Sequence, residues 1–170
     1  MKILILNGSP TPNGNTVALV NAFKDGAESK GHEVNVVNVA HKKVSGCMAC
    51  NFCKRNNGQC VQKDDMQEIY PQIQDADMIV FASPIYYFIM SAQLESVIHR
   101  FYAINAPQKA KYSALLLSSY SSNVYSGAIA QYKDMIAYMG MADKGIVTAD
   151  NSTNKTPEKL AEARELGESL

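Results

Sequence analysis

The sequence lacks a net charge and lacks any long apolar stretch. Its 170 residues include 16 basic and 16 acidic side chains, which cancel. No global field therefore attracts nucleic acid or an anionic membrane, and we expect neither as a partner. No apolar run approaches the roughly 18 residues of a membrane span, and the N-terminal run Ile3–Leu6 is too short for a signal-peptide core. These absences predict a cytoplasmic protein whose partners are small molecules or other proteins.

Several catalytic patterns are missing as well. No Ser-His-Asp arrangement and no pair of carboxylates is evident, so no catalytic acid or base is assigned. The three histidines, His32, His41 and His99, do not have metal-ligand spacing. No repeat or linker divides the chain, and its length fits one domain that buries roughly 70% of the surface of its unfolded form. We therefore expect a single domain over residues 1–170 that needs no disulfide crosslinks.

Short apolar runs of strand length alternate with segments of helical spacing. The runs, rich in Ile, Val and Leu, span residues 2–7, 33–39, 78–83, 113–119 and 145–149. The helical segments span residues 16–29, 65–74, 91–104, 127–139 and 157–170, and Asp64 and Asp65 are expected to cap the second of them. Such alternation requires parallel pairing through right-handed crossovers. It predicts an α/β three-layer sandwich, Rossmann-like or flavodoxin-like, that binds ligands beyond the carboxyl ends of its strands.

The first strand runs into a loop rich in glycine and hydroxyl groups, residues 7–19. It is not a Walker A loop, because five residues separate Gly8 from Gly14 and Asn15 replaces the lysine. It is not a dinucleotide fingerprint, because Pro10 stands where a motif that begins at Gly8 needs its second glycine. Backbone N–H groups and the dipole at a helix start favour an anion. We predict that the loop holds a terminal phosphate through Ser9, Thr11, Asn13, Asn15 and Thr16. The alternative is that one of these side chains only caps the helix.

Three consecutive aromatic residues, Tyr86, Tyr87 and Phe88, follow the third strand, which Pro84 is expected to end. They therefore lie on a loop at the predicted ligand-binding edge. Exposed apolar patches mark binding sites, so the rings predict a flat heteroaromatic ligand. The alternative is that the rings pack against the next helix or a partner subunit. For Phe88, packing and ligand contact are equally supported. A further loop, residues 118–127, is expected to close the third side of the pocket.

All four cysteines lie in one segment, at Cys47, Cys50, Cys53 and Cys60. Three cysteines at two-residue gaps can wrap a loop around one iron-sulfur cubane, with a fourth ligand supplied from nearby. The gap of six residues before the last cysteine, followed by Val61, departs from the two-cluster ferredoxin pattern. Four thiolates also suit a structural zinc ion, and metal-free redox thiols are a third reading. The segment follows the second strand, so we expect the thiols at the same edge of the sheet as the phosphate loop.

Three stretches together, LNGSPTPNGNT, ASPIYY and CMACNFCKRNNGQCVQKDDM, resemble the flavodoxin-like NADPH-dependent FMN reductase family, especially its iron-sulfur flavoprotein branch. The resemblance spans nearly the whole chain. It implies a five-stranded parallel flavodoxin-like sheet with FMN at the strand ends and a cysteine-rich insertion loop at residues 46–61. Carried over, Ser9, Asn15 and Thr16 would hold the FMN phosphate. The isoalloxazine ring would lie along Pro84, Ile85, Tyr86, Tyr87 and Phe88, and the remaining assignments are Ser119 and Tyr120.

These features predict an FMN-dependent NAD(P)H oxidoreductase that passes electrons from a nicotinamide to FMN and on to a small-molecule or protein acceptor. A [4Fe-4S] cluster would carry electrons if the four cysteines hold one. Backbone N–H groups near residues 85–87 are expected to stabilise the reduced ring. The alternatives are a non-enzymatic flavin electron carrier that docks with redox proteins, and a thiol-based redox sensor. The zero net charge favours the enzyme, and the resemblance implies a homo-oligomer.

Overall fold

The computed structural model describes residues 1–170, and strands alternate with helices along the chain. The strands are β1 (Lys2–Asn7), β2 (Glu33–Asn38), β3 (Met78–Pro84), β4 (Tyr112–Ser118) and β5 (Ala142–Ala149). The helices are α1 (Asn15–Ser29), α2 (Met66–Asp75), α3 (Ala92–Arg100), α4 (Ser126–Tyr138) and α5 (Pro157–Glu168). Three short 3-10 helices are η1 (Val39–His41), η2 (Cys53–Arg55) and η3 (Phe101–Ala103). Every predicted strand and helix is confirmed, with shifts only at the ends.

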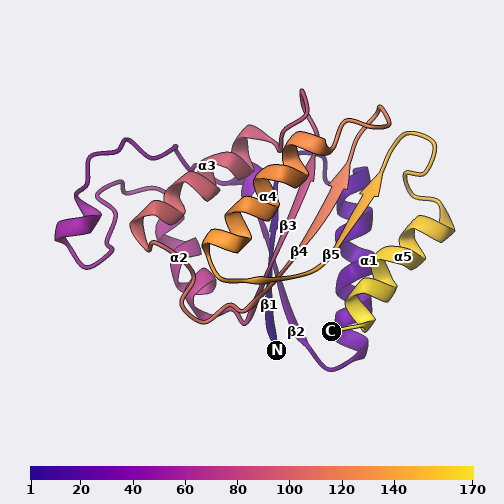
Figure 1. The fold of residues 1–170 in the computed structure, drawn as a ribbon, viewed down its shortest axis with the longest axis horizontal. Coiled ribbons are helices and arrows are strands. Elements are labelled where there is room, and N and C mark those ends of the chain that lie inside the picture. The colour runs from indigo at the N-terminus through magenta and orange to yellow at the C-terminus, as the bar shows by residue number, and fades with distance from the viewer.

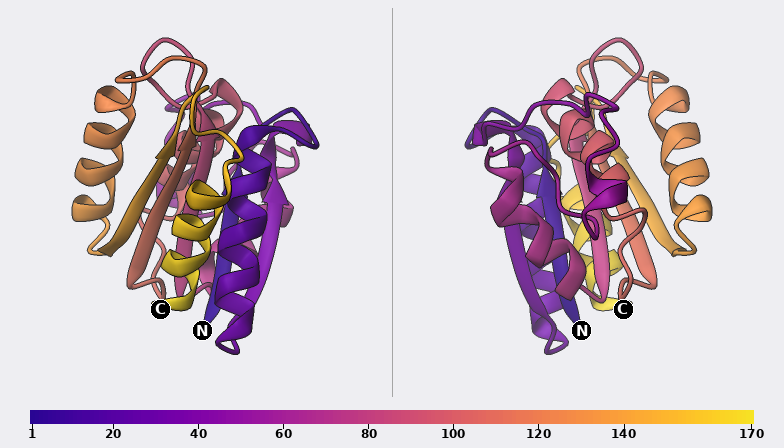
Figure 2. Two further views of the ribbon diagram at one scale, coloured as in Figure 1. Left: turned by 90° about the vertical axis from the view of Figure 1, so that its right-hand side faces the viewer. Right: turned by 90° about the vertical axis from the view of Figure 1, so that its left-hand side faces the viewer.

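The five strands form one parallel sheet in the order β2-β1-β3-β4-β5. This is the flavodoxin-like order, and it decides between the two doubly wound folds. Helices α1 and α5 cover one face of the sheet, and α2, α3 and α4 cover the other (Figure 1). Figure 2 shows the same three layers from both sides, with the two chain ends at the edge opposite the long loops. The predicted three-layer sandwich is confirmed.

The apolar strands supply two cores, one on each face of the sheet. Side chains of a strand point alternately to opposite faces, so Leu4 and Leu6 of β1 join the core under α2, α3 and α4. Ile3 and Ile5 join the core under α1 and α5. All four side chains are buried. Burial on both faces is the physical reason why these strands read as continuous apolar runs.

The carboxyl ends of the strands lie at one edge, and the loops that leave them approach one another closely. The Gly8 N–H donates to the Ala82 carbonyl at 2.8 Å, and a Cβ at Gly8 would collide with the Ser91 hydroxyl. Pro84 ends β3 as expected, and as the last residue of the strand it still pairs with Ser118 of β4. A proline is tolerated at that terminal position, where the lost N–H breaks no interior ladder bond. None of the helices combines the length and the apolar composition needed to cross a bilayer.

Candidate functional site

A pocket of about 530 Å³ lies at the carboxyl edge of the sheet, a volume typical of small-molecule sites. The loops after β1, β3, β4 and β5 contribute its walls. Its lining consists of Ser9, Pro10, Thr11, Gly14, Asn15, Thr16, Pro84, Ile85, Tyr86, Ser118, Ser119, Tyr120, Asn151 and Asn154. The structure therefore brings together all the residues predicted for FMN except Asn13, Tyr87 and Phe88.

The start of α1 opens into this pocket without a side-chain cap. Gly14 is the N-cap residue, no side chain accepts a hydrogen bond from the first turn, and that turn contains no acidic residue. The expectation that Asn15 or Thr16 merely caps the helix is therefore not met. The Thr16 hydroxyl instead lies 2.7 Å from the Ser118 hydroxyl, and both side chains are buried. Uncapped N–H groups of the first helical turn need an acceptor, and an anion in the pocket would supply one.

The loop between β1 and α1 is held in shape by its own polar groups. The side chain of Asn7 accepts the Ser9 N–H at 3.1 Å and donates to the Asn38 side chain at 2.8 Å. The Gly14 N–H donates to the Thr11 carbonyl at 3.0 Å. These bonds fix the loop around the pocket, which Thr11 and Thr16 help to line. Because the loop is already ordered, binding a ligand costs the protein less conformational entropy.

The loop after β5 completes the pocket, and sequence reasoning missed its contribution. Asn154 donates its side-chain N–H to the Ser119 carbonyl at 2.8 Å, while its Oδ1 is buried without a partner. Lys155, in a left-handed conformation, donates to the Asn13 carbonyl at 2.7 Å. Asn13 thus helps the site through its backbone, which explains why its side chain does not line the pocket. The only sequence signal was the polar run that follows the last strand, Asp150 to Thr156.

The chemistry of the lining fits FMN. No Asp, Glu, Lys or Arg lines the pocket, so neutral hydroxyls, amides and the α1 N-terminus face a bound phosphate, with Lys155 near the same loop. Helix N-termini of this kind bind phosphate groups without a lining cation. The unpartnered Asn154 Oδ1 can accept from a hydroxyl or a ring N–H. Tyr86 and Tyr120 are exposed, with Tyr120 82% accessible, so both rings are open to a flat ligand.

The aromatic loop forms a tight, strained turn. Tyr86 and Ile89 exchange backbone hydrogen bonds of 3.1 and 3.2 Å, and the two residues between them, Tyr87 and Phe88, have φ of 48° and 71°. This geometry suits Asn and Gly, and each larger residue costs roughly 1–2 kcal/mol there. The Phe88 carbonyl accepts from the Ala128 N–H at 3.0 Å, which anchors the turn to α4. Tyr87 is 96% exposed, and neither ring lines the pocket.

The backbone donors expected near residues 85–87 are mostly engaged. The Ile85 N–H donates to the Ser118 carbonyl at 2.8 Å, and the Tyr86 N–H donates to Ile89. Only the Tyr87 N–H has no backbone partner. Behind the pocket, burial raises the pKa of Tyr125, so its phenol stays protonated and lies 2.6 Å from the Ser119 hydroxyl. No side chain of the pocket is arranged as a catalytic acid or base.

The cysteine-rich loop does not lie at the pocket, contrary to expectation. It leaves the carboxyl end of β2 but packs beside the far end of α3 (Figure 1). The start of α3 packs against Gly8 through Ser91, whereas its last residue, Arg100, lines a cavity with the cysteines. A helix of nine residues is about 13 Å long. The cavity and the flavin-sized pocket share no lining residue.

The four cysteines surround one narrow cavity. Cys47 and Cys50 are exposed, Cys53 is buried and Cys60 is intermediate, and all four side chains line the cavity. Its volume of about 10 Å³ is roughly that of one water molecule. No three of its side chains are arranged to hold a metal ion. A cubane cluster would therefore require the loop to open around it.

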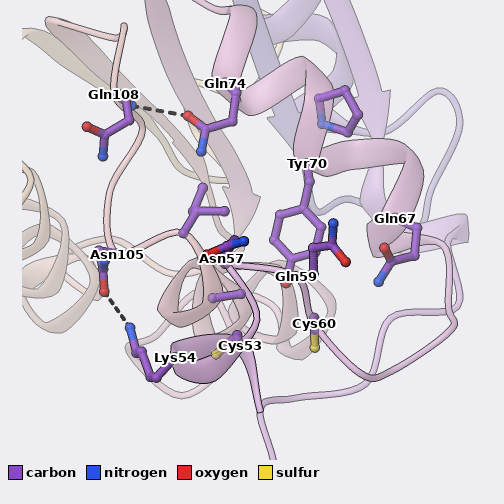
Figure 3. Close-up of a pocket in the computed structure, with 14 residues that line it drawn as sticks. Cys53, Lys54, Asn57, Gln59, Cys60, Gln67, Tyr70, Gln74, Asn105 and Gln108 are labelled. Atoms are coloured by element: carbon purple, nitrogen blue, oxygen red, sulfur yellow. Dashed lines mark hydrogen bonds between the residues drawn. The ribbon is translucent and has the colours of Figure 1, made fainter. Parts of the chain in front are cut away.

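A second, open cleft gives access to two of these thiols (Figure 3). It has a volume of about 600 Å³ and lies between the cysteine loop, α2 and the segment after η3. Cys53 and Cys60 lie on its wall. Its other polar groups are mainly carboxamides, from Asn57, Gln59, Gln67, Gln74, Asn105 and Gln108. The buried Cys53 and the partly exposed Cys60 thus lie beside an open cleft that shares no lining residue with the carboxyl-edge pocket.

A buried ion pair fixes the cysteine loop, and sequence reasoning missed it. Arg100 is 1% exposed and binds Asp64 with both terminal nitrogens, at 2.5 and 3.1 Å. It also donates to the Ser45 carbonyl at 3.0 Å. Burial alone would raise the pKa of Asp64, but hydrogen bonds from Arg100 and from the Ser45 N–H hold it below the usual value. Asp65 occupies the N-cap position of α2 as expected, but its side chain makes no cap hydrogen bond, and the Asp64 carboxylate accepts the Met66 N–H instead.

The fold and the pocket define a flavodoxin-like α/β protein with a pocket of small-molecule size at the carboxyl edge of its sheet. Residues 1–154 match the model of the NADPH-dependent FMN reductase family, and the chain belongs to that family. The resemblance identified from the sequence is confirmed.

Individual relatives agree with this assignment. The chain is 32% identical over 151 residues to an iron-sulfur flavoprotein of Archaeoglobus fulgidus, a match that covers 86% of this chain and 65% of that protein. The chain spans between about half and two thirds of the length of the curated relatives it matches. Among solved structures, the NAD(P)H:quinone oxidoreductase of Methanothermobacter marburgensis has a TM-score of 0.77 at 17% identity and covers 100% of this chain and 96% of its own.

A second solved structure has a bound flavin. It is an FMN-dependent NADH-azoreductase of Bacillus anthracis in complex with FMN, with a TM-score of 0.68 at 17% identity. The match covers 99% of this chain and 96% of that one. At this level of identity, both structural likenesses establish the shared fold.

Proposed function

We propose that this chain is an FMN-dependent NAD(P)H oxidoreductase. Its pocket binds FMN, a nicotinamide delivers a hydride to the flavin, and the electrons pass on to an acceptor. The observation that carries this proposal is the uncapped start of α1, which opens into a pocket lined by neutral hydrogen-bond donors. Bound FMN supplies the redox chemistry, because it accepts a hydride and releases electrons one or two at a time.

The residues of the chain bind and orient the cofactor. The first turn of α1 and the hydroxyls of Ser9, Thr11 and Thr16, with the amide of Asn15, hold the phosphate. Pro84, Ile85 and Tyr86, together with Ser119 and Tyr120, line the same pocket and would hold the ring. Asn154 Oδ1 is buried without a hydrogen-bond partner, and a donor group of the cofactor would supply one. The Tyr87 N–H has no backbone partner, but Tyr87 does not line the pocket, so it is not assigned to the ring.

The four cysteines would hold a [4Fe-4S] cluster in this proposal. Support comes from four cysteines around one cavity, from the name of the Archaeoglobus relative, and from the open cleft beside Cys53 and Cys60. Because the cavity between the cysteines is too narrow for a cluster, the loop would have to rearrange as a cluster assembles. Zinc and metal-free thiols remain the alternatives, and in the present conformation of the loop no three of its side chains are arranged to hold a metal ion.

The organisation of the whole protein is also a proposal. Residues 1–170 form one FMN-binding domain with the cysteine-rich insertion at residues 46–61, and the domain assembles as a homo-oligomer. The electron acceptor is a small molecule, such as a quinone, or another protein. The cytoplasmic location stays a prediction.

Anaerobic mixing with NADPH or NADH tests the proposal. The purified, FMN-loaded protein should lose its flavin absorbance near 450 nm much faster than free FMN at the same concentration. Photoreduction of the same sample provides the control, because it shows that the bound flavin can be reduced. Bleaching by light but not by either nicotinamide within minutes would support the non-enzymatic carrier instead. A protein that binds no flavin would contradict both functions.

A further inference from the structure

The loops after β4 and β5 form one wall of the carboxyl-edge pocket, and this wall offers hydrogen-bond acceptors. Ser119 and Asn154 both line the pocket, and the side-chain nitrogen of Asn154 donates to the Ser119 carbonyl at 2.8 Å. This bond fixes the orientation of the amide, because a carbonyl oxygen can only accept. The amide oxygen, Oδ1, is left buried without a partner. A buried acceptor of this kind needs a donor, and the pocket is where a ligand would bring one.

Ser119 presents an acceptor for a similar reason. Its hydroxyl lies 2.5 Å from the Ser121 carbonyl and 2.6 Å from the Tyr125 phenol. The carbonyl can only accept, so the hydrogen of the Ser119 hydroxyl is committed to it, and the Tyr125 phenol must donate to Ser119. Burial raises the pKa of Tyr125, so its phenol stays protonated at neutral pH. The Ser119 oxygen therefore keeps one free lone pair and has no hydrogen left for a ligand.

This acceptor wall, Ser119 Oγ and Asn154 Oδ1, is tied to the loop between β1 and α1. Lys155, the residue after Asn154, donates to the Asn13 carbonyl of that loop at 2.7 Å. The uncapped start of α1, at the end of the same loop, offers N–H donors to an anion. The pocket is thus polarised, with donors at the α1 end and acceptors on the wall beside it. A complementary ligand carries an anionic group and, a few atoms away, hydrogen-bond donors.

We infer that Asn154 is a specificity-determining residue of the FMN site: its Oδ1 accepts from a hydroxyl of the ribityl chain, beside Ser119, which also offers only an acceptor. The inference rests on the proposed function. The ribityl chain joins the phosphate of FMN to the ring and carries three hydroxyl donors, whereas the oxidised ring has one donor, its N3–H. The alternative is that Asn154 only ties the loop after β5 to the loop after β4.

Deletion of single hydroxyls from the ligand separates these two roles. The apoprotein is titrated by flavin fluorescence with FMN and with its 2′-, 3′- and 4′-deoxy analogues, in the wild type, Asn154→Leu and Asn154→Asp. The quantity compared is the dissociation constant of an analogue divided by that of FMN, because a general weakening of the site cancels in this ratio. Leucine removes the acceptor and aspartate keeps one, while both lose the donor to the Ser119 carbonyl.

The wild type should bind at least one deoxy analogue about 3- to 10-fold more weakly than FMN, the effect of one neutral hydrogen bond. Asn154→Leu should reduce that ratio to less than about twofold, and Asn154→Asp should retain it, although its charge weakens the binding of every flavin phosphate. Thr153→Val is the matched control. The Thr153 hydroxyl accepts the Asp150 N–H in the same loop at 3.0 Å, but Thr153 does not line the pocket. This variant should keep the wild-type ratio.

Three results would overturn the inference. The wild type could bind all three deoxy analogues within about twofold of FMN, Asn154→Leu could keep the full ratio, or Asn154→Asp could lose it as Asn154→Leu does. The first comparison needs no variant, so the inference can fail even if Asn154→Leu does not fold.

An N3-methyl analogue of FMN provides a further arm of the test. A ratio that Asn154→Leu abolishes for this ligand, but not for the deoxy analogues, would assign Oδ1 to the ring and overturn the inference as well. All of these results leave the binding of FMN by the wild type and its bleaching by nicotinamides unaffected. A failure of this inference is therefore distinguishable from a failure of the proposed oxidoreductase.

Discussion

Removal of the Thr16 hydroxyl is the sharpest perturbation of the pocket. Thr16 is 1% exposed, and its hydroxyl lies 2.7 Å from that of Ser118 at the start of α1. Thr16→Val keeps the shape of the side chain but deletes its hydrogen bond. In the absence of FMN the variant should lose about 1 kcal/mol of unfolding free energy, the typical net value of a neutral hydrogen bond.

The effect on FMN binding should be larger than the effect on stability. A hydrogen bond to a charged group contributes about 1.5–3 kcal/mol. Its loss should raise the dissociation constant for FMN by roughly 10- to 150-fold. Fluorescence titration of the apoprotein with FMN measures this constant, because bound flavin and free flavin differ in emission. Urea unfolding with and without FMN checks it independently, since a ligand that binds only the folded state raises the unfolding free energy by RT ln(1 + [L]/Kd).

Ser113→Ala is the matched control for this experiment. Ser113 lies on β4, as Ser118 does, and its buried hydroxyl donates to the Ile79 carbonyl at 2.8 Å, near the opposite end of the strand. The control should lose a similar amount of stability and bind FMN within twofold of the wild type. The reasoning is refuted if Thr16→Val binds FMN as tightly as the wild type, or if Ser113→Ala weakens binding as much.

Three further predictions concern the turn, the second loop and the core. Replacing Tyr87 by Asn and Phe88 by Gly should raise the unfolding free energy by about 1 kcal/mol, because the new residues suit positive φ; a lower urea midpoint would show that the turn is not strained. Lys155→Met should weaken FMN binding about 3- to 10-fold at low ionic strength and less at high salt, because a screened charge near the phosphate loop is lost; equal affinity at low salt would exclude that role. Burial raises the pKa of Tyr132, whose phenol donates to Asp143 at 2.9 Å. Its contribution to stability is complete below the ordinary phenol pKa of about 10 and is lost as the pH rises toward the higher folded-state pKa. Between about pH 8 and about pH 11 the urea midpoint should decrease more for the wild type than for Tyr132→Phe. Equal decreases would contradict the prediction.

The fold could be predicted from the sequence because its signals are local. Buried parallel strands such as Met78–Pro84 read as unbroken apolar runs, and the helices between them have a different period. The loop after β1 could also be predicted, because its glycines, hydroxyls and helix start are adjacent in the sequence. The order of the strands could not be derived from periodicity alone. It entered through the resemblance to a family.

The errors concern contacts between residues far apart in the sequence. The direction of the cysteine loop depends on Arg100, which is 36 residues from Asp64, and on Lys54, which donates to the Tyr102 carbonyl 48 residues away. Lys155 reaches the Asn13 carbonyl across 142 residues. A single sequence has no local pattern for such pairs. A charged residue within an amphipathic helix, such as Arg100, also gives no sign that it is fully buried.

The central claim is that the open start of α1 binds the phosphate of FMN, and a comparison of FMN with riboflavin tests it most directly. Riboflavin carries the same ring and ribityl chain but has no phosphate. Titrations of the apoprotein should give a dissociation constant for FMN of about 1 µM or lower, and riboflavin should bind at least about 100-fold more weakly because it forgoes several charge-assisted hydrogen bonds. Equal affinities for the two flavins, or no binding of FMN at about 100 µM, would contradict the account.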